Sequence, residues 1–171
     1  FVLVDSGIPK DTNGVLGSAR QRAERLCSDF WSLPQDPDEA VRTLSPAKRD
    51  AMIARGVLVN RAITMRARRL LEGAFTPAQL GALLDEHHAQ LAENVGVSHP
   101  RIDTYLDGAR EHGALGGKIN GSGGGGSFFL LAPEDPEPLR QHFVRQGLRA
   151  WTVNVGPGLQ LNQSPVLEEV G

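Results

Sequence analysis

The feature that most constrains this fold is a six-residue run, Gly121 to Gly126, in which every residue except Ser122 is glycine. The run lies between Lys118-Ile119 and a strongly apolar segment, Phe128 to Leu131. Burial of both flanks would fix both ends of the run, which favours a strand, loop and strand unit over a flexible linker or a wide hairpin loop. Only glycine lets consecutive backbone N–H groups converge on an anion, so such a loop can cradle a phosphate.

Apolar periodicity and turn signals divide the rest of the chain into strands and helices. The apolar run Phe1 to Val4 predicts a buried strand that ends in an Asp5-Ser6-Gly7 turn. Apolar residues three and four apart predict helices at about 15–31, 45–72, 76–95, 100–112 and 136–147. Further strands are expected at 117–120, 127–132 and 150–155, with a connector of at most one helical turn at 32–43. Because the helices are grouped, the pattern predicts an α+β fold in which an antiparallel sheet packs against helices.

Length and composition restrict the class of protein. A chain of 171 residues that is 40% hydrophobic and 22% charged is expected to form one domain. A net charge of −2 gives no electrostatic argument for nucleic acid or for an anionic membrane. The one cysteine, Cys27, excludes an internal disulfide and favours a cytoplasmic setting. No run reaches the roughly 18 to 20 apolar residues that span a bilayer, so no membrane partner is expected.

Three segments, in order, carry a resemblance to a known family. The segment Gly113 to Ser127, with its glycine-rich run, resembles the third conserved motif of the galactokinase, homoserine kinase, mevalonate kinase and phosphomevalonate kinase (GHMP) superfamily. Upstream, His87 to Leu91 and Gly96 to Asp103 resemble the segment that precedes this motif in galactokinases and mevalonate kinases. The opening Asp5 to Lys10, with Arg20 and Arg22, resembles the start of their carboxyl-terminal half.

The resemblance implies a GHMP kinase C-terminal domain at residues 1–161, with a loose tail at 162–171. The implied fold is a four-stranded antiparallel, ferredoxin-like sheet packed against a group of helices. ATP and Mg²⁺ would be bound mainly by an amino-terminal half, whose Pro-x-x-x-Gly-Leu-x-Ser-Ser-Ala phosphate loop is absent from these residues. The catalytic residues are expected in that half, so these residues alone are expected to be inactive.

The implied activity is ATP-dependent phosphorylation of a small-molecule alcohol, and a sugar such as galactose is favoured. Galactokinases usually carry a sugar-contacting tyrosine before the arginines that match Arg20 and Arg22, and here Gly14 to Ala19 contains none. Heptose phosphates and mevalonate therefore stay open as substrates. The alternative is a stand-alone metabolite-binding or regulatory module of the same fold without catalysis.

The candidate site residues fall into two groups. The phosphate-proximal loop comprises Gly121, Ser122, Gly123, Gly124, Gly125 and Gly126. Asp5, Arg61 and Lys118 are candidate contacts to substrate or phosphate, although an Asp-Ser-Gly turn, a solvated arginine face and a strand end are the favoured explanations of these residues. No metal site is expected, because adjacent His87 and His88 point to different helix faces and no four-ligand cluster is present. Cys27 is expected to be a buried structural thiol.

Overall fold

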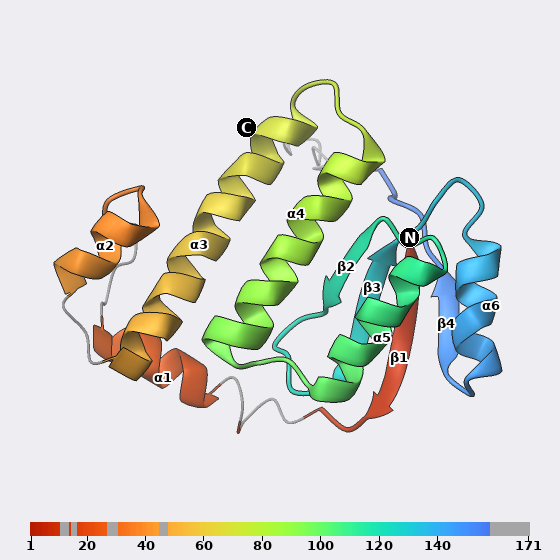
Figure 1. Ribbon diagram of the computed structural model, residues 1–171, viewed down its shortest axis with the longest axis horizontal. Helices are drawn as coiled ribbons and strands as arrows, with labels where there is room; N and C mark the ends of the chain where they lie inside the picture. The colour runs from red at the N-terminus through yellow and green to blue at the C-terminus, as the bar shows by residue number, and fades with distance from the viewer. Residues whose placement is uncertain (11–13, 15–16, 27–30, 45–47, 158–171) are drawn as a thin grey trace, which may run out of the picture.

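The computed structural model describes residues 1–10, 14, 17–26, 31–44 and 48–157. Its sheet contains β1 (Val2–Ile8), β2 (Gly116–Ile119), β3 (Gly126–Leu131) and β4 (Arg149–Thr152) in the order β2-β3-β1-β4, with every neighbouring pair antiparallel. With helices between β1 and β2 and again between β3 and β4, this is a split β-α-β-β-α-β arrangement. The predicted four-stranded antiparallel, ferredoxin-like sheet is confirmed (Figure 1).

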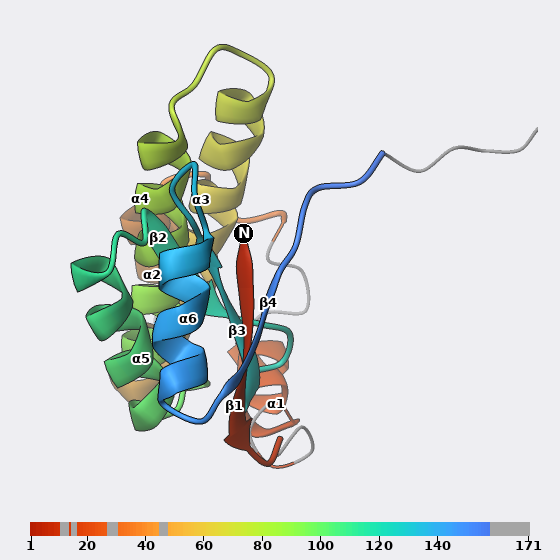
Figure 2. The same cartoon turned by 90° about the vertical axis from the view of Figure 1, so that its right-hand side faces the viewer.

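The main core lies between one face of the sheet and two helices, α5 (Pro100–Glu111) and α6 (Glu137–Arg145), which cover that face (Figure 2). Alternation along the strands buries Val2, Val4 and Phe128 on this side. The Phe128 and Phe143 rings meet edge to face with their centroids 5.5 Å apart. The other fully or nearly buried members of the core are Ile102, Leu106, Ala109, Ile119, Leu130, Ala132, Leu139 and Ala150.

The long connection from β1 to β2 contains α1 (Gly17–Leu26), α2 (Pro37–Leu44), α3 (Lys48–Leu71), α4 (Pro77–Ala89) and a π-helix, η2 (Gln90–Val95). Figure 1 shows α3 and α4 side by side and antiparallel. Thr76 forms a capping box with Gln79 at the start of α4. The last six residues of the predicted 76–95 helix adopt the wider π form, which ends at Gly96 in a left-handed conformation (φ +72°).

Several boundaries differ from the sequence-based expectation. β1 continues through the predicted turn to Ile8, because the Ser6 hydroxyl donates to Gly126 O (2.5 Å) and strand pairing resumes at Ile8 after a bulge. Asp5 therefore lies within the strand and not beyond it. The expected connector at 32–43 contains the eight-residue helix α2, and β4 ends at Thr152 instead of Val155.

Some other predictions are corrected or fall outside the described residues. On the long helix predicted at 45–72, Met52 is 46% exposed, whereas Ile53, Leu58 and Ile63 are buried. The described part of the first predicted helix ends at Leu26, and Trp31 lies in a turn. Cys27, the expected start of the long helix at Ser45-Pro46, and the tail 162–171 lie outside the described residues.

Candidate phosphate-binding loop

The loop that joins β2 to β3 has a backbone that only glycine adopts readily. Positive φ angles of +67°, +79°, +74°, +131° and +78° occur at Gly121, Gly123, Gly124, Gly125 and Gly126. An L side chain in this region costs roughly 1–2 kcal/mol per residue. The glycine run is thus explained by backbone conformation before any ligand is considered.

The same loop packs between two backbone segments that are distant from it in the sequence. On one side Gly124 N donates to Val97 O (2.8 Å), and Gly123 lies so close to Val97 O that an added Cβ would overlap it. On the other side a Cβ at Gly125 would lie 2.5 Å from Pro9 O. The loop is therefore a packed connection, held between the segment after β1 and the turn before α5.

Two polar groups at the loop have no role in the packing of the sheet. The Ser122 hydroxyl oxygen is buried, and no described residue forms a hydrogen bond with it. Lys10, which follows β1, lies along the loop, with its Nζ 2.8 Å from the position of a Cβ at Gly121. The sequence did not indicate Lys10 as a site residue, because only the pairing of β1 with β3 brings residue 10 to residue 121.

A polar network supports β2, the edge strand that leads into the loop. Along α4, Asp85 Oδ1 accepts from Gly117 N (2.9 Å) and His88 Nδ1 accepts from Ile119 N (3.3 Å). These side chains are three residues apart on one helical face, and they take two N–H groups that an edge strand would otherwise leave unpaired. Nearby, Gly81 allows the α4 backbone to touch the backbone of Leu115 and Gly116.

The network continues from His88 into α5 and reaches the turn that holds the loop. Asp103 Oδ1 lies 3.0 Å from His88 Nε2 and accepts from Ser98 Oγ at 2.5 Å. Because Ile119 N can only donate, His88 Nδ1 must be the acceptor and its proton must lie on Nε2, facing Asp103. Ser98 directly follows Val97, whose carbonyl oxygen accepts the hydrogen bond from Gly124 N. The network therefore connects β2 and α4 to the backbone segment that contacts the loop.

Burial lowers the pKa of two adjacent histidines of α4, His87 and the network member His88. It lowers the pKa of His87 to about 4, assisted by the nearby positive charge of Lys118 and by His88. Burial also lowers the pKa of His88, and the hydrogen bond and negative charge of Asp103 oppose that shift. Both side chains are half-buried.

The other candidate contacts do not gather at the loop. Asp5 pairs with Arg149 across the sheet and accepts from Gly7 N (3.0 Å); mainly that backbone hydrogen bond lowers its pKa. Lys118 lies within β2, where Nζ donates to Ile119 O (2.9 Å) and stands 5.3 Å from the Phe129 ring centre. Burial lowers the pKa of Lys118.

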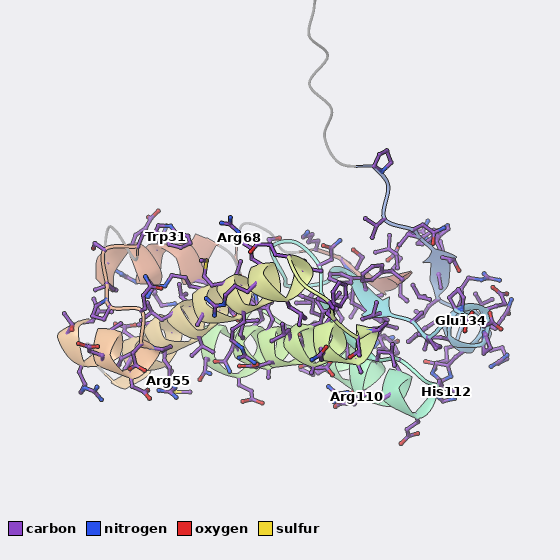
Figure 3. All side chains as sticks on the ribbon, turned by 90° about the horizontal axis from the view of Figure 1, so that it is seen from above. Trp31, Arg55, Arg68, Arg110, His112 and Glu134 are labelled. Atoms are coloured by element: carbon purple, nitrogen blue, oxygen red, sulfur yellow. The ribbon has the colours of Figure 1, made fainter. Side chains whose placement is uncertain are left out.

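Arg61 is held in another part of the molecule. It is 8% exposed on α3, where Nη2 donates to Pro34 O (2.5 Å) and the guanidinium lies 6.0 Å from the Trp31 ring centre. Figure 3 places Trp31 at the opposite end of the molecule from His112. These contacts give Arg61 the structural task of fixing the 31–34 segment on α3.

An acidic cavity of about 330 Å³ lies between α4 and α5, lined in part by Asp85, Asp103, Asp107 and Arg110. Arg110 and Asp85 form an ion pair across it (3.1 Å). Across the described ranges, no group of three or more His, Cys, Asp or Glu side chains is placed to hold a metal ion. Nor does any helix in those ranges have the length and apolar character needed to cross a membrane.

The comparisons with known proteins agree on one family of similar proteins. Residues 70–149 match the family model described as GHMP kinases C terminal. Galactokinase from Streptomyces coelicolor (strain ATCC BAA-471 / A3(2) / M145) is 35% identical over 96 residues, 56% of this chain and 24% of that protein. Mevalonate kinase from Thermococcus onnurineus (strain NA1) is 46% identical over 56 residues, 33% of this chain and 16% of that protein.

The structural comparison agrees with the sequence comparison. The crystal structure of Lactococcus lactis galactokinase complexed with galactose superposes with a TM-score of 0.72 and 20% identity, over 92% of this chain and 45% of that one. The chain thus spans less than half the length of these relatives. The loop, its supporting network and α6 all lie within the matched residues, and in this segment, residues 70–149, the chain is similar to the GHMP kinase C-terminal domain family.

Proposed function

We propose that this chain is the carboxyl-terminal part of an ATP-dependent small-molecule kinase that phosphorylates a sugar hydroxyl, most like a galactokinase. The observation that carries the proposal is the loop Gly121–Gly126, with successive left-handed glycines clamped between Val97 and Pro9 inside the family-matched segment. A loop clamped from both sides is pre-organised, which favours positioning of a phosphoryl group at no cost of ordering during the reaction.

The proposal assigns ATP and Mg²⁺ mainly to an amino-terminal half. In this chain the group that fits a phosphate is the loop itself, whose glycines place no side chain of their own over its backbone, together with the Ser122 hydroxyl, which has no hydrogen-bond partner among the described residues. The amide of Gly124 is already committed to Val97 O and is not part of that set. A bound Mg²⁺ would neutralise charge on the transferred group, and the chain's own contribution is to orient that group.

We propose galactose as the substrate, and the comparisons with galactokinases support that choice. The galactokinase match covers 56% of this chain, against 33% for the mevalonate kinase match, and the galactokinase structure has galactose bound. Mevalonate and heptose phosphates are the competing acceptors. We infer one domain at residues 1–161, in a cytoplasmic protein.

The test is phosphoryl transfer by the complete reading frame that contains these residues. ATP consumption is measured with galactose, mevalonate and a heptose phosphate as acceptors, and the product is identified by mass spectrometry. We expect turnover with galactose and at least tenfold less with the other two. Saturable binding of one acceptor without ATP turnover would replace the kinase with the second candidate, a metabolite-binding module.

A further inference from the structure

The side chain of Lys10 follows the glycine loop from one end to the other. Its Cδ, Cβ and Cγ lie 3.4 to 3.8 Å from the position of a Cβ at Gly126, and its Nζ lies 2.8 Å from that of a Cβ at Gly121. The aliphatic stem therefore crosses the loop where the two glycines lack side chains. A larger residue at Gly121 would displace the ammonium group.

The positive charge of Lys10 is not neutralised by any contact among the described residues. Its side chain is exposed, and within the described part of the chain no carboxylate forms an ion pair with it. The two cations predicted from the sequence are both committed, Lys118 to Ile119 O and Arg61 to Pro34 O. Asp5, on the strand that leads to Lys10, is paired with Arg149.

We propose that Lys10 Nζ is the cationic contact for the phosphate group that binds the loop Gly121–Gly126, an inference that rests on the proposed function and deepens it. An ammonium is a compact, strongly hydrated point charge that suits a phosphate oxygen, and a charge-assisted hydrogen bond is about twice as strong as a neutral one. The buried Ser122 hydroxyl, which has no partner among the described residues, marks the same loop as incomplete without a further polar group. Lys10 is a binding and positioning residue, and it takes no part in proton transfer.

The experiment is an NMR titration of the ¹⁵N-labelled 171-residue chain with inorganic tripolyphosphate, following the amide signals of Gly121–Gly126. The variants are Lys10→Gln, Lys10→Arg and the control Arg69→Gln, which removes the same charge from an exposed residue near the end of α3. The end of α3 lies next to the start of α4, whereas the loop contacts Val97, which follows the end of the helix that α4 and η2 form. About 28 Å of helix therefore separates the end of α3 from the loop (Figure 1).

We expect the wild type and Arg69→Gln to bind tripolyphosphate with the same dissociation constant, Lys10→Gln to bind at least tenfold more weakly, and Lys10→Arg to lie between them. Equal binding by Lys10→Gln and wild type overturns the inference, and so does a wild-type loop whose signals do not shift at 10 mM tripolyphosphate. Failure of the proposed function is a separate result, because it appears as absent phosphoryl transfer by the complete reading frame whatever the Lys10 variants do.

Discussion

The side chains Asp85 and His88 of α4 take the place of a further strand at the edge of β2. The sequence showed His87 and His88 on a predicted helix but could not show which would face β2, because that depends on how the helix packs on the strand. Close contact between Gly81 and Gly116 sets that packing. Neither glycine had a local signal, since each lies inside a segment whose type was already predicted.

Asp103 is the residue whose loss should weaken this network most. Asp103→Ala removes the partner of His88 and Ser98, so we expect the free energy of unfolding to fall by about 2 kcal/mol. Asp107→Ala is the matched control, one turn further along α5 and exposed, and should change it by less than about 0.5 kcal/mol. Urea denaturation at pH 7 measures both. Equal losses in the two variants would show that the network adds no stability.

The half-buried His87 makes the stability depend on pH. Its pKa is about 4 in the folded protein and 6.5 in the unfolded chain, so between these values the unfolded chain binds the proton more readily. Stability should therefore fall as the pH drops from about 6.5 to 4. Because the side chain is partly exposed, we expect about 1–2 kcal/mol, less than the value implied by the full shift.

The check compares urea midpoints of the wild type and His87→Gln at pH 7 and pH 4.5. The substitution should reduce the pH-dependent loss of unfolding free energy by about 1–2 kcal/mol, while the carboxylate contributions stay common to both proteins. An identical loss in the two proteins would contradict the burial of His87.

At the scale of elements, the glycine loop combines backbone strain with close packing, and two glycines separate these effects. Gly123 and Gly147 share a φ of +79°, but a Cβ at Gly123 would overlap Val97 O, whereas one at Gly147 meets nothing within 4 Å. Gly147→Ala should lower the unfolding free energy by about 1 kcal/mol from backbone strain alone. Gly123→Ala should lower it by at least about 1 kcal/mol more.

Thermal or urea unfolding of the two alanine variants measures this difference. The amide signal of Gly124, which donates to Val97 O, reports whether the loop itself has moved. A Gly123→Ala variant as stable as Gly147→Ala, with that signal unshifted, would mean that the loop is not clamped by the 97–98 turn.

Sequence periodicity predicted the elements whose signals are local. The helices that begin at about residues 76 and 100 have capping residues and a proline in their first turn. The strands that flank the glycine run are indicated by the apolar residues on one side of that run. The extension of β1 to Ile8 was not predictable in this way, because it depends on a hydrogen bond between Ser6 and Gly126, 120 residues away. The same non-local pairing brings Lys10 to the loop, so the sequence did not indicate Lys10 as a site residue.

At the scale of the whole molecule, the two faces of the sheet differ. In the described part of the chain α5 and α6 cover one face, and the opposite face presents Leu3, Phe129 and Trp151, the last 45% exposed (Figure 2). The family resemblance predicted the sheet and the loop, since both lie in the segment that carries its motifs. Arg61 and Asp5 were singled out as charges on predicted elements, and only the three-dimensional structure reveals their pairing with Pro34 and Arg149.

The measurement that tests the kinase account most directly is transfer of the ATP γ-phosphate to galactose by the complete reading frame, in the wild type, Gly123→Ala and Gly147→Ala. We predict transfer by the wild type, a rate within about threefold of it for Gly147→Ala, and a loss of at least about 100-fold for Gly123→Ala, because misplacing a positioning group by about 1 Å has that effect. A folded Gly123→Ala protein as active as wild type, or a wild type that transfers no phosphate to any acceptor tried, would contradict the account.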